Sequence, residues 1–143
     1  MEKLPIDHLK EHVTDNFTWA EALTLHNWGF AAVPSAHIHN NIIKTCVKLE
    51  LIRSFFGDKP IRVLSFFRPA AYNAAVKGSA QSAHIDGLAC DFVVKDIHSH
   101  HARLKLLKKL DEFGIRMERL PEDHNWVHID LIMPLGDSRY FFP

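Results

Sequence analysis

Two short stretches of the sequence carry the side chains most able to do chemistry. The first, residues 84–91, holds His84 and Asp91 seven residues apart, and the second, residues 126–130, holds His128. Two imidazoles and one carboxylate, with a fourth position left to water, are typical of catalytic zinc sites. Structural zinc sites more often close the fourth position with a further Cys or His. The pattern therefore favours a zinc hydrolase over a zinc-stabilised scaffold.

The surroundings of these side chains strengthen the hypothesis. Asp91 stands between Cys90 and Phe92 in an apolar run, and His128 lies in another apolar run. Burial of a carboxylate is costly unless it is paired or bound to a metal. Each residue alone could be a hydrogen-bonded core residue, but the joint pattern favours one shared metal ion.

Composition indicates one ordinary globular domain covering residues 1–143, with 47% hydrophobic and 24% charged residues. The 17 basic and 17 acidic residues balance, so no basic face and no nucleic-acid partner are expected. No apolar run approaches membrane-spanning length, and we expect no membrane insertion. Residues 1–8 carry charges where a signal peptide is apolar, which predicts synthesis in the cytoplasm.

Periodicity and end signals predict an α+β fold. Thr18 and Glu21 form a capping box that opens a short helix, and Gly57 and Gly114 end two longer ones. We expect helices over 18–25, 39–56 and 99–113, strands over 61–67, 88–94, 115–120 and 126–133, and a loop over 68–81. These elements predict a small, largely antiparallel sheet with helices packed on one face.

Further residues around the two stretches carry a family resemblance. The run Ser-Phe-Phe-Arg-Pro-Ala-Ala-Tyr-Asn at 65–73, then Gly78, then 82–91 and 128–130, resembles the M15 family of zinc D-Ala-D-Ala carboxypeptidases. Residues 17–21 resemble its phage and prophage branch. The resemblance covers residues 16 to 133 and implies the fold shared by DD-peptidases and the hedgehog signalling domain. It also implies a Zn²⁺ cofactor and peptidoglycan peptides as substrates.

The resemblance also implies roles for single residues. His84, Asp91 and His128 match the zinc ligands, and Arg68 matches an arginine near the scissile carbonyl or the substrate carboxylate. A guanidinium stays charged and can form two hydrogen bonds with such a group. A salt bridge that fixes the loop is the alternative for Arg68. Ser82 matches a substrate-contacting serine, and a turn-stabilising hydroxyl is its alternative.

The catalytic base departs from the family pattern. Many members carry Glu or Asp three residues before the last zinc histidine, where this chain has Asn125, which cannot accept a proton at neutral pH. Phage-type members carry Glu six residues before the histidine, and Glu122 matches that position. Glu122 is therefore the base that the resemblance implies, and the parity of an extended chain, in which residues 122 and 128 share a face, agrees with it. Asp123 is the reserve, His124 a further hydrogen-bond donor to substrate, and loss of activity a third outcome.

The leading hypothesis is a zinc peptidase that hydrolyses peptide stems of peptidoglycan, of D-Ala-D-Ala carboxypeptidase or L-Ala-D-Glu endopeptidase type. A phage or prophage origin would place its action at the cell wall or in a virion, with other phage proteins as partners. Asn125 motivates the alternative of a catalytically inactive, zinc-bound binding or structural domain, such as a virion component. An intracellular dipeptidase for D-amino-acid peptides is the third hypothesis.

Overall fold

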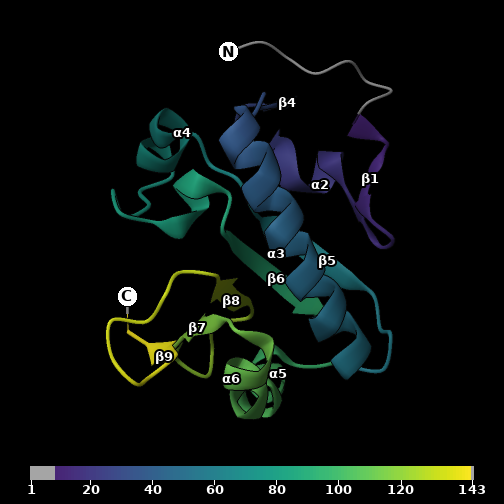
Figure 1. The fold of residues 1–143 in the computed structure, drawn as a ribbon, viewed down its shortest axis with the longest axis vertical. Helices are drawn as coiled ribbons and strands as arrows, with labels where there is room; N and C mark the ends of the chain where they lie inside the picture. The colour runs from purple at the N-terminus through teal and green to yellow at the C-terminus, as the bar shows by residue number, and fades with distance from the viewer. Residues whose placement is uncertain (1–8, 143) are drawn as a thin grey trace.

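A sheet in the order β5-β6-β8-β7-β9 forms the centre of the computed structural model, which describes residues 9–142 (Figure 1). Neighbouring strands are antiparallel except for β7 and β9, which are parallel. The strands are β5 (Ile61–Ser65), β6 (Ala89–Val94), β7 (Arg116–Glu118), β8 (Val127–Asp130) and β9 (Tyr140–Phe141). The predicted α+β class is confirmed, whereas β9 has no counterpart in the prediction. Residues 1–8, which carried the expectation about a signal peptide, lie outside the described residues.

The alternation of side chains gives the central strands two different faces. Phe92, Met117 and Ile129 are fully buried in the hydrophobic core. Their neighbours in the chain point to the opposite face, because successive side chains of a strand alternate. That second face carries Asp91 and His128, so the same strands supply both the core and the polar residues of interest.

Helix α3 (Ala36–Phe55) runs across the sheet and packs its apolar side into the core (Figure 1). Ile42 and Leu49 are fully buried there. The sequence predicted a start near residue 39, but the helix begins three residues earlier. The cause is Ser35, whose hydroxyl accepts a hydrogen bond from the Ile38 amide at 3.2 Å and caps the helix.

The N-terminal part adds two small two-stranded sheets and a short helix beside the central sheet. The elements are β1 (His12–Thr14), β2 (Phe17–Thr18), α2 (Trp19–Leu23), β3 (Thr24–Leu25) and β4 (Phe30–Ala31). The predicted capping box is confirmed: the Glu21 amide donates to Thr18 Oγ1 at 3.2 Å, and the Thr18 amide donates to Glu21 Oε1 at 2.9 Å. The four strands were not predicted, because two- and three-residue strands leave no periodic signal.

Two other predictions need correction. The loop predicted over 68–81 contains helix α4 (Ala70–Ala75), which an alanine-rich run after Pro69 favours. The helix predicted over 99–113 is divided into α5 (Ser99–Leu106), the 3-10 turn η2 (Leu107–Lys109) and α6 (Leu110–Phe113). No helix within residues 9–142 is both long enough and apolar enough to cross a membrane.

Candidate metal centre

His84, Asp91 and His128 lie together on the polar face of the sheet, with one donor atom from each within 4.8 Å of the others. We call these three residues the metal cluster. Asp91 Oδ1 lies 2.7 Å from His128 Nδ1, and Asp91 Oδ2 lies 3.3 Å from His84 Nε2. Asp91 and His128 are direct partners in the β6–β8 ladder, so their side chains must meet on one face.

The ring of His84 is oriented from its other nitrogen. His84 lies in the 3-10 turn η1 (Ala83–Asp86), and its Nδ1 donates to the Phe66 carbonyl oxygen at 2.6 Å. This bond leaves Nε2 directed at Asp91. The Ser82 hydroxyl accepts from the His84 amide at 3.2 Å and caps the turn. The structure thus gives Ser82 the turn-stabilising contact, and its contact with substrate stays a prediction.

Helix α3 holds the far end of this turn in place. Asn41 Nδ2 donates to the Asp86 carbonyl and Thr45 Oγ1 donates to the Gly87 carbonyl, both at 2.9 Å. Gly87 has φ +71°, and a side chain there would approach Ile42 to 3.1 Å. Buried polar groups of the core helix therefore position the loop that carries His84.

His128 is held in the same way from the opposite direction. Its Nε2 contacts Asp130 Oδ2 at 3.2 Å, and Asp130 accepts two hydrogen bonds from Arg116 at 2.8 and 2.9 Å. Nδ1 therefore faces Asp91. Metal-binding histidines typically have their second nitrogen held by a carboxylate or a backbone carbonyl, as both histidines have here. The donor set fits a divalent metal ion such as zinc.

The charges of the cluster are strongly coupled. Burial alone would raise the pKa of Asp91, but hydrogen bonds from His128 and His84 hold it well below its ordinary value. Burial would lower the pKa of His128, but hydrogen bonds to Asp130 and Asp91 raise it to about 9. Without a metal, the protein therefore stabilises an ionised carboxylate beside a protonated imidazole. A metal cation replaces that positive charge, because it binds neutral imidazole.

Arg68 lies directly beside the metal cluster, and the contact with substrate that the resemblance implied for it stays a prediction. Its Nη2 is 3.4 Å from Asp91 Oδ2, Nε donates to Ser65 Oγ at 2.8 Å, and Nη1 donates to Asn73 Oδ1 at 3.4 Å. Asn73 also donates to the Ser79 carbonyl at 2.8 Å. A Cβ on Gly78 would come within 2.2 Å of Asn73 Oδ1, so this loop needs glycine there. The loop holds the arginine, and the arginine faces the cluster.

The residues predicted near the catalytic base lie in exposed positions. The side chain of Glu122 is 82% exposed and contacts His100 Nε2 at 3.3 Å. The side chain of Asp123 is 89% exposed and pairs with His124 at 3.1 Å. The argument from an extended chain was wrong, because the His124 amide donates to the Pro121 carbonyl and closes a turn. The structure does not bring these three side chains to the cluster, and their roles stay predictions.

The loop over residues 121–126 is also held by a buried arginine. Arg103 of α5 is 2% exposed and donates to the carbonyl oxygens of Pro121, His124 and Trp126 at 2.5 to 2.9 Å. The Asn125 side chain accepts a hydrogen bond from the Ser99 hydroxyl at 3.2 Å. Asn125 therefore connects the loop to α5.

Sequence reasoning missed one carboxylate, Glu118. It lies on β7, next to Met117, which pairs with Ile129, and its Oε2 is 3.8 Å from His128 Nδ1. Its side chain is 18% exposed, and burial raises its pKa above the ordinary value. The signal was the alternation of Arg116, Met117 and Glu118 in a predicted strand. Glu118 lies beside His128 only because that strand pairs with β8.

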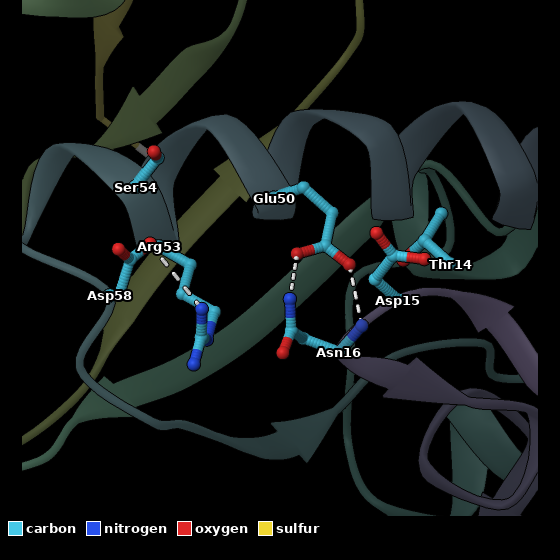
Figure 2. A pocket seen from close by; sticks show the side chains of 7 residues that line it. All are labelled: Thr14, Asp15, Asn16, Glu50, Arg53, Ser54 and Asp58. Carbon is cyan, nitrogen blue, oxygen red and sulfur yellow. Dashed lines mark hydrogen bonds and ion pairs between the residues drawn. The ribbon is translucent and has the colours of Figure 1, made fainter.

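Two cavities differ in their relation to the cluster. One of about 180 Å³ is lined by Ser65, Arg68 and Tyr72 among others, and therefore reaches the residues beside Asp91. The other, of about 470 Å³, lies between the β1–β2 turn and α3 and has polar walls (Figure 2). There, Asn16 donates twice to the Glu50 carboxylate, each time at 2.7 Å. Only the smaller cavity shares residues with the surroundings of the cluster.

Comparison with known proteins identifies one similar protein and one matching family model. The zinc D-Ala-D-Ala carboxypeptidase of Streptomyces albus G is 38% identical over 77 residues, which are 53% of this chain and 30% of that protein. The chain therefore spans less than a third of this relative's length. The family model of peptidase M15 matches residues 15–130, which include the whole metal cluster and Arg68. Because this match covers most of the sequence, the resemblance is confirmed and the chain belongs to the peptidase M15 family.

Proposed function

We propose that this protein is a zinc peptidase that hydrolyses peptide stems of bacterial peptidoglycan. The observation that carries the proposal is the convergence of His84 Nε2 and His128 Nδ1 on Asp91, with the other nitrogen of each ring already held. The name of the Streptomyces albus G relative, a zinc D-Ala-D-Ala carboxypeptidase, supports zinc as the metal and a D-Ala-D-Ala peptide as the substrate. We further propose that the α+β architecture is of the hedgehog/DD-peptidase type.

The proposed chemistry divides the work among a few side chains. His84, Asp91 and His128 would hold zinc, which when bound polarises a carbonyl and lowers the pKa of water. Arg68 presents a permanent positive charge to an oxygen of the substrate from beside Asp91. The hydrogen bonds of Arg68 to Ser65 and Asn73 fix that charge before the substrate arrives.

We assign the proton transfer to Glu118. A base has to stand within reach of the attacking water, and Glu118 lies 3.8 Å from a cluster nitrogen in a largely buried position. It would accept a proton from the attacking water and pass it to the leaving amine. Glu122, the base that the resemblance implied, stays the competing assignment, although its side chain is 82% exposed and contacts His100.

A second candidate function is a catalytically inactive zinc-bound domain, such as a virion component. It is favoured by Asn125, which stands where many family members carry the base and which is engaged by Ser99. For the active protein we propose the bacterial cell wall as the site of action, and a phage or prophage as the origin.

The experiment that separates the two functions uses purified protein and purified peptidoglycan fragments. Released peptides and amino acids are measured with the protein as prepared, after chelation, and after zinc is added back. A peptidase should lose activity on chelation and regain it with zinc. Stoichiometric zinc binding without release from any cell-wall type would establish the inactive domain instead.

A further inference from the structure

We propose that Phe141, on the C-terminal strand β9, is a positioning residue of the metal centre. Its ring fixes the plane of the His128 ring and holds Arg116 against Asp130, and so sets the direction in which His128 presents Nδ1 to a metal ion. The inference deepens the proposed function, because it rests on the same metal cluster. It gives a role to a strand that lies beyond residues 15–130, the part of the chain that the family model matches.

Strand register places Phe141 on the face of the sheet that carries the metal cluster. Figure 1 shows β9 at the edge of the sheet, beside β7. The two strands are parallel, and Phe141 is the ladder partner of Glu118. The Met117 amide donates to the Arg139 carbonyl at 2.8 Å, and the Arg119 amide donates to the Phe141 carbonyl at 2.7 Å. Ladder partners direct their side chains to one face, so Phe141 shares the face of Glu118, whose carboxylate approaches the cluster.

The first contact of Phe141 on this face is with a ring of the metal cluster. The rings of Phe141 and His128 meet edge to face at 74°, with centroids 5.9 Å apart. Asp130 holds His128 Nε2 at one point, but the last torsion of a histidine side chain is broad and can still turn. An aromatic ring packed against the imidazole restricts that rotation. Phe141 therefore fixes the part of the ring orientation that the hydrogen bond leaves free.

The second contact is with the arginine behind the metal cluster. The guanidinium carbon of Arg116 lies 3.9 Å from the centroid of the Phe141 ring, within the range of cation–π attraction. The same guanidinium donates two hydrogen bonds to Asp130, at 2.8 and 2.9 Å. The Arg116 side chain is 18% exposed, and cation–π attraction strengthens when the cation is desolvated. Phe141 therefore covers the guanidinium in the position in which it holds Asp130.

Both contacts converge on His128. One is direct, from ring to ring. The other passes through Arg116, the ladder partner of Asp130, to the carboxylate that contacts His128 Nε2. Ligand side chains need such support, because a small displacement of one ligand is enough to loosen a metal site. Phe141 is thus placed to stabilise both the plane of the imidazole and the partner of its second nitrogen.

The neighbours of Phe141 on β9 provide an internal control. Tyr140 and Phe142 point to the opposite face, because successive side chains of a strand alternate. Their ring centroids lie 4.9 and 4.2 Å from the guanidinium carbon of Arg119. Phe142 therefore makes the same kind of contact as Phe141, an aromatic ring on an arginine, but on the face away from the metal cluster.

Zinc binding to the metal-free protein tests the inference without turnover. Phe141→Leu keeps an apolar side chain but removes the flat ring. In a calorimetric titration it should weaken zinc binding by about three- to tenfold, less than the loss of a direct hydrogen-bond partner of a ligating histidine. Phe141→Tyr keeps the ring and should retain the wild-type affinity. Phe142→Leu is the matched control and should also retain it. Equal affinities for Phe141→Leu and Phe142→Leu would overturn the inference.

The absorption spectrum of bound Co²⁺ separates a positioning role from a merely structural one. The visible bands of cobalt depend on the geometry of its ligands, so at saturating cobalt they should shift in Phe141→Leu and stay unchanged in Phe142→Leu. An unchanged spectrum together with a lower melting temperature would show that Phe141 serves only the fold. Phe141→Met guards against a folding defect, because methionine fills irregular gaps but has no ring. It should show the same spectral shift and the same loss of zinc affinity as Phe141→Leu.

The metal-free protein gives a measurement that does not need a bound metal. The proton between His128 Nε2 and Asp130 can be followed by nuclear magnetic resonance. Its exchange with water should be several-fold faster in Phe141→Leu, because the ring is held less well, and unchanged in Phe142→Leu. If the cluster binds no zinc but exchange responds in this way, the proposed function fails and the positioning of His128 by Phe141 stands. If exchange is the same in both variants, the positioning role fails and the proposed function is unaffected.

Discussion

Two groups of histidines and carboxylates in this protein have similar compositions and opposite physical surroundings. One is the metal cluster of His84, Asp91 and His128. The other, which we call the surface group, gathers around the start of α5 and the loop before β8, and its members are His98, His100, His101, Glu122, Asp123 and His124. The surface group has more potential ligands, yet only the first group brings its donor atoms to one point.

The difference comes from where each side chain obtains its partners. In the metal cluster, the β6–β8 register brings together residues 37 positions apart, and burial forces each polar atom to find a partner. In the surface group, Asp123 pairs with its neighbour His124, and Glu122 contacts the half-buried His100. The comparison teaches that long-range register, rather than the number of ligands, makes a metal site.

Removal of a cluster ligand should give the largest effect. Asp91→Ala is expected to weaken zinc binding by more than about 100-fold, because loss of an outer partner alone costs about 10- to 100-fold. Calorimetric titration of the metal-free protein with zinc measures it. His100→Ala, the control in the surface group, should leave the affinity unchanged. Zinc lost from the control and retained by Asp91→Ala would reverse the comparison.

The next largest effect is expected from removal of the catalytic base. The two candidates are Glu118, which lies beside the metal cluster, and Glu122, which belongs to the surface group. Glu118→Gln should reduce hydrolysis of a peptidoglycan peptide by about 100-fold or more, the usual contribution of a positioned proton acceptor. Glu122→Gln should change it little, because its side chain points to His100. Steady-state rates at equal zinc occupancy decide between them. A large loss only in Glu122→Gln would restore the assignment implied by the family resemblance.

A change behind the cluster should have an intermediate effect. Asp130→Asn removes the charge that holds His128 Nε2 and leaves Arg116 without its carboxylate. Zinc affinity should fall by about 10- to 100-fold, as for other outer partners of ligating histidines. Asp123→Asn is the matched change in the surface group and should leave it unaltered. Equal affinities for the two variants would mean that Asp130 serves only the fold.

The smallest effect is a pH dependence of the metal-free protein. The pKa of His128 is raised from 6.5 to about 9, so its stabilising charge is fully present below pH 6.5 and is lost as pH rises through 9. The melting temperature of the metal-free protein should therefore fall across that range. The zinc-loaded protein should fall less, because zinc binds the neutral ring. His100→Gln should still show the fall, whereas His128→Gln should abolish it.

The sequence was most informative where the chemistry is local. The spacing of His84 and Asp91 and the second motif at His128 identified the three residues that the structure brings together, and the capping box at Thr18 predicted the start of α2. The spacing of His84 and Asp91 is informative because one turn and one strand position these two side chains.

The parts that the sequence could not supply depend on pairing between distant segments. Glu118 faces the cluster only because β7 lies beside β8, and no residue near position 118 encodes that neighbour. The parity argument that supported Glu122 assumed an extended chain and was wrong, since the His124 amide donates to the Pro121 carbonyl and closes a turn. The role of Glu122 itself, which the family resemblance implied, stays a prediction. Helix α4 was missed because the proline and glycine around it are typical of loops, while its alanines favour a helix.

The buried Arg103 limits how the loop before β8 can vary in length. Most surface loops tolerate insertions, because water satisfies their backbone groups. Here the carbonyl oxygens of residues 121, 124 and 126 meet one guanidinium at fixed intervals. A residue inserted or deleted between them would leave buried donors without acceptors, at about 1–3 kcal/mol each. These bonds therefore fix the residue count of the loop, while they place no constraint on its exposed side chains.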